Sequence, residues 1–161
     1  MSHIPPDLLE FTEEWSSYED RLYQVYLETV VNAGLLFRSW PVKVLYRPET
    51  RGKGFSFWHV ISEAPDHNNR NEDDRIPDLE RCRKLRWVAW VIRNAGQDGF
   101  SWWENRRGSE TRVVIWAEVF DFAVVLAKRN GYYVLKTAYC VKERRRASFA
   151  RERDEYHRNL P

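Results

Sequence analysis

The segment from residue 122 to residue 139 constrains the fold most strongly, because its local sequence predicts a β-hairpin. Two apolar runs, residues 122–128 and 132–139, flank the sequence Arg129-Asn130-Gly131. An Asn-Gly pair between apolar runs favours the tight turn that joins two antiparallel strands. The second run ends in Lys-Thr-Ala-Tyr, although a strand that served only packing would carry Val or Ile there. We therefore expect an antiparallel sheet whose last strand carries polar side chains with a chemical role.

Hydrophobic periodicity predicts the other elements. The expected helices have apolar residues at helical spacing or a charged, helix-favouring composition, and they cover residues 18–33, 78–94 and 142–156. The other expected strands are short apolar runs, at residues 42–46, 55–62 and 113–118. Two polar segments, residues 64–76 and 97–110, are expected to be loops.

The order of these elements is helix, two strands, helix, three antiparallel strands and helix, which is typical of an α+β fold. We predict one domain over residues 18–161, with an N-terminal helix and a mostly antiparallel sheet of four to five strands packed by helices. A chain of 161 residues is long enough for one proper core. An acidic segment, residues 1–17, precedes the domain, and its charge raises the hypothesis that it covers a basic site.

The charge distribution suggests a phosphate-binding surface. The formal net charge is only +2, but basic residues concentrate in the segments 81–93, 106–112 and 142–153. A nearly neutral chain with basic blocks can bind nucleic acid through one face. The alternative is that each block is simply a solvated helix face.

Several classes of protein lose support from the sequence. The two cysteines, Cys82 and Cys140, form no CxxC pair, and the four histidines show no metal-ligand spacing, so we predict no disulfide, metal or cofactor. No Gly-rich phosphate loop or Gly-x-Ser-x-Gly motif is present. No apolar run approaches the roughly 18 residues of a membrane span, and no signal-peptide pattern is seen. We therefore expect a reduced, cytoplasmic protein that does not contact a membrane.

The candidate functional residues lie on two of the expected strands and on the second helix. His59 can exchange a proton near neutral pH, and strand alternation places Glu63 on its face. The same alternation puts Thr137 and Tyr139 on one face of the last strand and Lys136 on the other, unless a bulge redirects it. Cations that could hold a phosphate precede a strand or lie around the second helix, at Arg112, Arg75, Arg81, Arg83 and Lys84.

Each of these residues also has a purely structural interpretation. A strand histidine can bond to backbone through both ring nitrogens, and Thr137 is a good strand former. Lys136 can be a solvated charge at a sheet edge. The arginines can brace the sheet instead of binding a ligand.

Three short segments together resemble a known family. They are Phe57-Trp-His59-Val-Ile-Ser-Glu63, then Pro77-Asp-Leu-Glu-Arg81-Cys-Arg at a helix start, then Tyr132-Tyr-Val-Leu-Lys136-Thr137-Ala-Tyr139 before a basic helix. This combination resembles the phage-associated branch of the barnase–EndoU–colicin–RelE (BECR) ribonuclease-like fold, over residues 42–156. The resemblance implies an N-terminal helical part on a four-stranded antiparallel sheet, with the active site on the open sheet face. It also implies RNA cleavage without metal, in which the 2′-hydroxyl attacks the adjacent phosphorus and the 5′-oxygen leaves.

The resemblance also implies roles for individual residues. His59 would be the general base or acid, and Arg81 would hold the phosphate. Thr137 and Tyr139 would bond the phosphate or orient the nucleophile. Support would come from Glu63, Lys136 and Arg112, and RNA contacts from Arg75, Arg83 and Lys84.

Three interpretations of function remain open at this stage. The first is a metal-independent endoribonuclease, acting as a toxin or phage effector with a cognate antitoxin or immunity protein. The second is a non-catalytic module on the same scaffold that binds RNA, or binds a protein through exposed Trp102, Trp103 and Trp116. The third is that the chain is itself the partner of a toxin or of a phage-defence factor.

Overall fold

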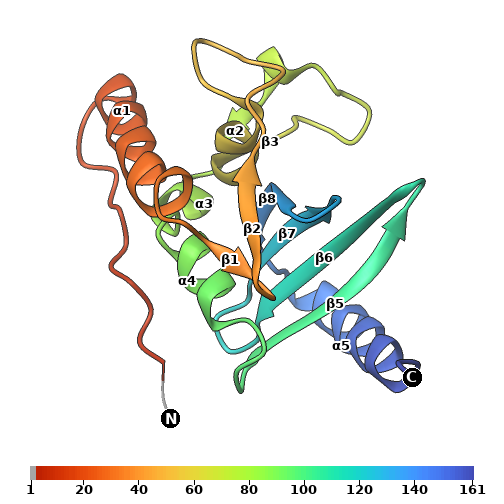
Figure 1. Cartoon of the computed structure of the whole chain (residues 1–161). Coiled ribbons are helices and arrows are strands. Elements are labelled where there is room, and N and C mark those ends of the chain that lie inside the picture. The colour runs from red at the N-terminus through yellow and green to blue at the C-terminus, as the bar shows by residue number, and fades with distance from the viewer. Residues whose placement is uncertain (1–2) are drawn as a thin grey trace.

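Six strands of residues 3–161 form one sheet in a computed structural model of the chain, which describes those residues (Figure 1). The strand order is β1-β2-β8-β7-β6-β5. The strands are β1 (Leu36–Phe37), β2 (Trp40–Val44), β5 (Phe100–Arg107), β6 (Glu110–Ala117), β7 (Phe122–Lys128) and β8 (Tyr133–Cys140). A separate two-stranded pair consists of β3 (Ser62–Glu63) and β4 (Ile76–Pro77).

The predicted hairpin is confirmed. Strands β7 and β8 pair antiparallel, and the turn between them closes with a bond from the Arg129 amide to the Tyr132 carbonyl, 2.9 Å. Gly131 adopts φ +87°, a conformation that glycine reaches without strain. The α+β class and the single domain are also as predicted.

The size and character of the sheet differ from the prediction of four to five mostly antiparallel strands. The sheet has six strands and is mixed, because β2 pairs parallel to β8. Strand β5 occupies the segment that was expected to be a polar loop. It is an edge strand that pairs only with β6, so only some of its side chains are buried, and the usual apolar alternation is weak.

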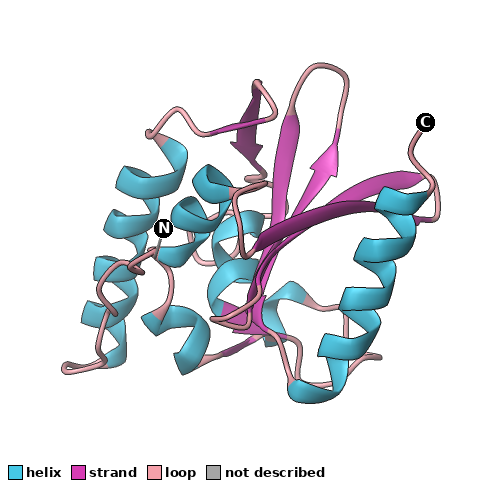
Figure 2. Ribbon diagram, turned by 90° about the horizontal axis from the view of Figure 1, so that it is seen from below, coloured by secondary structure: helices cyan, strands magenta, loops and turns pink. Residues whose placement is uncertain are grey.

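The helices cover the two faces of the sheet unequally. On one face lie α1 (Trp15–Tyr26), its π-helical continuation η1 (Leu27–Val31), α2 (Phe55–Ile61), α3 (Leu79–Arg83) and α4 (Trp87–Asn94). On the other face α5 (Glu143–Arg158) lies alone (Figure 2). The segment predicted as one helix over residues 78–94 forms two helices, α3 and α4, separated by a turn that begins at Lys84. Within the described residues no helix is both long and apolar enough to cross a membrane.

A second, smaller core holds α5 against the sheet. Phe149 of α5 is fully buried, and its ring packs edge-on against Trp103 and Trp116 with centroid distances of 5.1 and 5.5 Å. These two tryptophans are 0% and 2% exposed, and Trp102 is partly buried against the main core. The expectation that Trp103 and Trp116 are exposed is therefore wrong, because both indoles pack in this core, whereas Trp102 is only partly buried.

Residues 55–61 form a helix, so the predicted strand over residues 55–62 is wrong. The run Phe-Ser-Phe-Trp-His-Val-Ile is short and apolar, and such a run fits a buried helix as well as a strand. Strand β2 leaves β8 after Val44, and α2 takes its place beside β8. Ser56 joins the three elements, since its hydroxyl donates to the Leu135 carbonyl at 2.6 Å and accepts from the Leu45 amide at 2.8 Å.

The acidic N-terminal segment packs against α3 and α4. Leu9 is 2% exposed, and its amide donates to the Arg83 carbonyl at 2.9 Å. Trp87 Nε1 donates to the Pro6 carbonyl at 2.9 Å, and Glu10 pairs with Arg83. None of residues 3–17 lines the cavity described next, so the hypothesis that this segment covers a basic site there is not supported.

Candidate functional site

A cavity of about 480 Å³ lies between α2, the loop that joins β3 to β4, and strands β6 and β8. Its lining includes four basic side chains, Arg70, Arg75, Arg112 and Lys136, and two acidic ones, Asp66 and Glu72. The remaining lining includes Phe55, His59, His67 and Thr137. An excess of fixed positive charge in a concave site favours an anionic ligand.

His59 stands in the wall of this cavity, in the last turn of α2. Its Nε2 atom lies 2.7 Å from Oε1 of Glu72, which belongs to the short helix η2 (Glu72–Asp74). A second constraint comes from Phe55, whose ring stacks on the imidazole ring with a centroid distance of 3.8 Å. The carboxylate and the aromatic ring together fix the orientation of the imidazole.

The surroundings of His59 favour its neutral form. Burial lowers the pKa of His59, and the charges of Arg75 and Lys136 lower it further, whereas the hydrogen bond and charge of Glu72 raise it. The net direction is downward from the ordinary value. An ionised carboxylate only accepts hydrogen bonds, so the neutral ring carries its proton on Nε2 and offers the lone pair of Nδ1. This is the protonation state of a general base at neutral pH.

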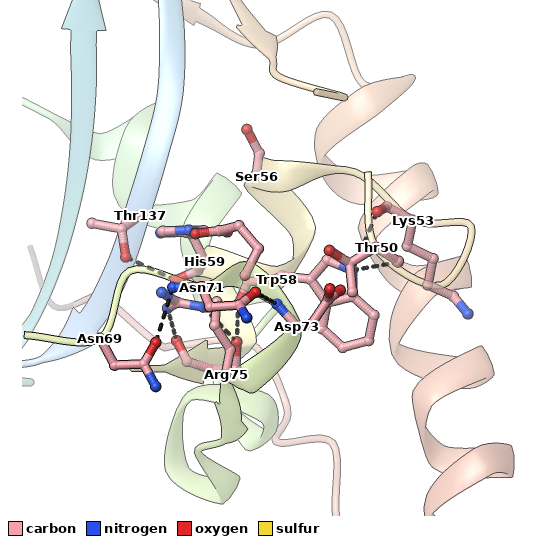
Figure 3. Close-up of polar contacts among 12 residues, drawn as sticks. Thr50, Lys53, Ser56, Trp58, His59, Asn69, Asn71, Asp73, Arg75 and Thr137 are labelled. Atoms are coloured by element: carbon pink, nitrogen blue, oxygen red, sulfur yellow. Dashed lines mark hydrogen bonds and ion pairs between the residues drawn. The ribbon is translucent and has the colours of Figure 1, made fainter. Parts of the chain in front are cut away.

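The loop that carries Glu72 is tied to the end of α2. The Arg75 guanidinium donates to Ser62 twice, from Nε to the hydroxyl at 3.0 Å and from Nη2 to the carbonyl at 2.5 Å. The Asn71 side chain accepts from the Asp73 amide at 3.0 Å and so caps η2 (Figure 3). These bonds hold the loop in the position where Glu72 meets His59.

Lys136 reaches the cavity because β8 contains a bulge. Val125 pairs with Thr137 and Leu126 with Leu135, which leaves Lys136 as the additional residue. A bulge rotates the side chains that follow it, so Lys136 and Thr137 both line the cavity. Alternation along the strand places Lys136 on the opposite face from Thr137 unless a bulge redirects it, and the structure contains this bulge. Burial lowers the pKa of Lys136, and the nearby guanidinium groups of Arg112 and Arg129 add to this effect against the opposing charge of Glu110.

Glu110 lies close to three cationic side chains beside the cavity. Its carboxylate lies 2.6 Å from Arg112 Nε, 3.2 Å from Arg129 Nη2 and 3.9 Å from Lys136 Nζ. These contacts keep the pKa of Glu110 below its usual range against the effect of burial. One carboxylate cannot neutralise three cations, so the cluster keeps a surplus of positive charge.

Thr137 and Arg81 hold the end of α2. The Thr137 hydroxyl donates to the His59 carbonyl at 2.7 Å (Figure 3). Arg81 Nη1 donates to the same carbonyl at 3.2 Å and to the Ser62 carbonyl at 2.6 Å. Thr137 thus lines the cavity. The side chains of Thr137 and Arg81 are both engaged in hydrogen bonds that position the backbone of His59.

The other predicted site residues lie elsewhere. Tyr139 and Glu63 line a second cavity together with Arg81. Arg83 is bound by Glu10 and Glu80 outside both cavities. Lys84 lies 3.7 Å from Glu80 and 3.7 Å from Cys140 Sγ. Glu63 cannot share a strand face with His59, because His59 is on a helix.

Sequence reasoning missed Glu72 and Glu110. Glu72 lies in a polar segment, and only its acidic neighbours and the preceding Asn71, a good helix N-cap, mark a short helix there. Glu110 begins a strand next to Arg112, a pairing that is ordinary on a sheet surface. Within residues 3–161, no group of three or more His, Cys, Asp or Glu side chains is arranged to hold a metal ion.

Comparisons of the chain with protein-family models, with curated proteins and with solved structures found no match.

Proposed function

We propose that the protein is an endoribonuclease that cleaves RNA by attack of the 2′-hydroxyl on the adjacent phosphorus, with its active site in the cavity at His59. The observation that carries the proposal is the pairing of His59 with Glu72 in a cavity that also holds Lys136 and Arg112. This arrangement combines an oriented neutral base with cations suited to a phosphate.

In the proposed reaction, His59 Nδ1 removes the proton of the 2′-hydroxyl. The 2′-oxygen bonds to phosphorus while the bond to the 5′-oxygen breaks, and the product strand ends in a 2′,3′-cyclic phosphate. Lys136 donates a proton to the departing 5′-oxygen, a role that its lowered pKa favours. Arg112 stabilises the negative charge that grows on the phosphoryl oxygens.

Glu72 acts through His59 and is a positioning residue. It accepts the Nε2 proton, keeps Nδ1 available and stabilises the imidazolium that forms when the base takes a proton. Thr137 and Arg81 fix the backbone carbonyl of His59 and therefore hold the ring in register with the cavity.

The test compares wild-type protein with His59→Gln on total tRNA and on a generic single-stranded RNA. A positioned general base contributes about 10²–10⁴-fold to a rate, so the variant should lose cleavage by that factor. His157→Gln serves as the matched control, since His157 is an exposed histidine of α5. Equal cleavage by wild type and His59→Gln would overturn the assignment of the base. Wild-type protein that shifts RNA in a gel without shortening it would favour a binding protein instead.

A further inference from the structure

A second cavity of about 530 Å³ adjoins the first along strand β8. Thr137 lines the first cavity and Tyr139 lines the second, and they are two residues apart on the same strand. Two residues of a strand span about 7 Å, so the cavities are near neighbours. Arg81 marks their boundary, because it lines the second cavity while its guanidinium bonds to the carbonyl of His59.

The second cavity carries cations from two helices. Arg81 comes from α3, and Lys142, Arg144 and Arg145 come from the start of α5. Lys142 and Arg144 are exposed and form no ion pair with any of residues 3–161. These two cations therefore remain available to a ligand.

The carboxylates of the cavity are largely engaged. Asp78 accepts from the Glu80 and Arg81 amides and lies 3.4 Å from Arg81 Nε. Glu80 is paired with Arg83 at 2.7 Å, and Arg83 does not line the cavity. Glu63 is the remaining acidic group in the lining. The cavity therefore presents more available positive than negative charge.

The N-terminus of α5 adds to this positive character, and the acidic residue of its first turn, Glu143, does not line the cavity. Lys142 is the N-cap residue, and its side chain forms no capping bond to the first amides of the helix. The N-terminus of a helix carries a partial positive charge from these amides. In a helix of 16 residues this end reinforces the neighbouring Lys142 and Arg144.

We propose that the second cavity binds the phosphate of a nucleotide a few positions away from the one cleaved, so that the substrate is a single strand of RNA lying along β8. This inference rests on the proposed function of the first cavity. A strand bound in this way places one phosphodiester against Lys136 and another, farther along the strand, against Lys142 and Arg144. Single strands follow such basic grooves because every nucleotide carries one phosphate.

The test measures binding separately from cleavage. The probe is a fluorescein-labelled oligouridylate with 2′-O-methyl groups at every position, which cannot undergo attack by a 2′-hydroxyl. Its affinity is measured by fluorescence anisotropy at several salt concentrations for wild type and for Lys142→Gln/Arg144→Gln. Arg151→Gln/Arg158→Gln is the control, because it removes the same charge from exposed residues farther along α5.

If each of the two cations neutralises one phosphate, the slope of log affinity against log salt should fall in magnitude by about 1.4 in the first double variant. The control should keep the wild-type slope. Equal slopes in the two double variants would overturn the second site, whether or not RNA is cleaved. The first double variant could show the expected decrease in slope although the wild-type protein cleaves no RNA. That result would support the second site and refute the catalytic proposal.

Discussion

The Nε2 atom of His59 lies 2.7 Å from Oε1 of Glu72, although the two residues come from different elements. His59 lies in the last turn of α2, and Glu72 begins a short helix in a polar loop. Arg75, which follows this short helix, ties the loop to Ser62 at the end of α2. The candidate site is thus an assembly of a core helix with a surface loop.

The pH dependence of cleavage should show the influence of Glu72 on His59. A general base works when neutral, so kcat/KM should rise with pH, with a midpoint below the value of about 6.5 for an unperturbed histidine. The midpoint lies lower because burial and Arg75 lower the pKa of His59. Glu72 raises this pKa, so Glu72→Gln should move the midpoint further down. The plateau should also fall, since the ring loses the carboxylate that orients it and stabilises the imidazolium.

The control for this experiment is Asp73→Asn, which removes another carboxylate of the same short helix, one that no hydrogen bond or ion pair among residues 3–161 joins to His59. Its profile should match wild type. A midpoint that moves upward in Glu72→Gln would contradict the assignment of His59 as the base.

Removal of Lys136 should reduce cleavage strongly. Lys136→Gln removes the ammonium group that donates the proton to the departing 5′-oxygen. A positioned general acid contributes about 10²–10⁴-fold to a rate, so the variant should lose kcat by that factor. Lys128→Gln removes a lysine of β7 that pairs with Glu104 outside the first cavity, and it should retain activity. Steady-state kinetics on a fluorogenic RNA compares the activities of the two variants. Comparable losses of activity in both would contradict a specific role for Lys136.

Arg81 should matter for stability more than its neighbour Arg83. Arg81 is 13% exposed and donates to two backbone carbonyls at the end of α2, so Arg81→Met should cost about 1.5–3 kcal/mol of unfolding free energy. Arg83 forms ion pairs with Glu10 and Glu80, whose side chains are more than half exposed, so Arg83→Met should destabilise the protein clearly less than Arg81→Met. Urea unfolding of the two variants provides the comparison. Equal midpoints would show that Arg81 is not a structural anchor.

The second core should depend on Phe149. Its ring is fully buried between Trp103 and Trp116, so Phe149→Ala should lower the unfolding free energy by about 3–5 kcal/mol. Tyr156 lies near the other end of α5 and is only partly buried, so Tyr156→Ala should cost clearly less. A loss below 1 kcal/mol for Phe149→Ala would mean that α5 does not pack as described.

The sequence predicted best those features that depend on local interactions. The β7–β8 hairpin follows from Asn130-Gly131 because turn geometry is set by the residues in the turn. The helix over residues 142–156 was predicted nearly correctly, and the structure has it as α5 (Glu143–Arg158). The segment 55–62 was assigned wrongly because its secondary structure is decided by what surrounds it, above all by the edge of β8 that β2 leaves open.

The candidate site was predicted in part for the same reason. His59 and Thr137 do meet, but through the backbone carbonyl of His59, a contact that no residue pattern encodes. Lys136 joins them only because one residue of β8 is left out of the pairing with β7. Glu72 depends on how a loop folds back over α2, which is a tertiary arrangement. The sequence could therefore indicate which strand lines the candidate site with polar side chains, but not which carboxylate meets His59.

The chemical identity of the RNA ends tests the central claim most directly. Wild-type protein is incubated with single-stranded RNA in excess EDTA, and the products are analysed by mass spectrometry. Attack by the 2′-hydroxyl, with His59 as the base, predicts fragments with 2′,3′-cyclic phosphate and 5′-hydroxyl ends. Fragments with 5′-phosphate and 3′-hydroxyl ends, or RNA that stays intact, would contradict it.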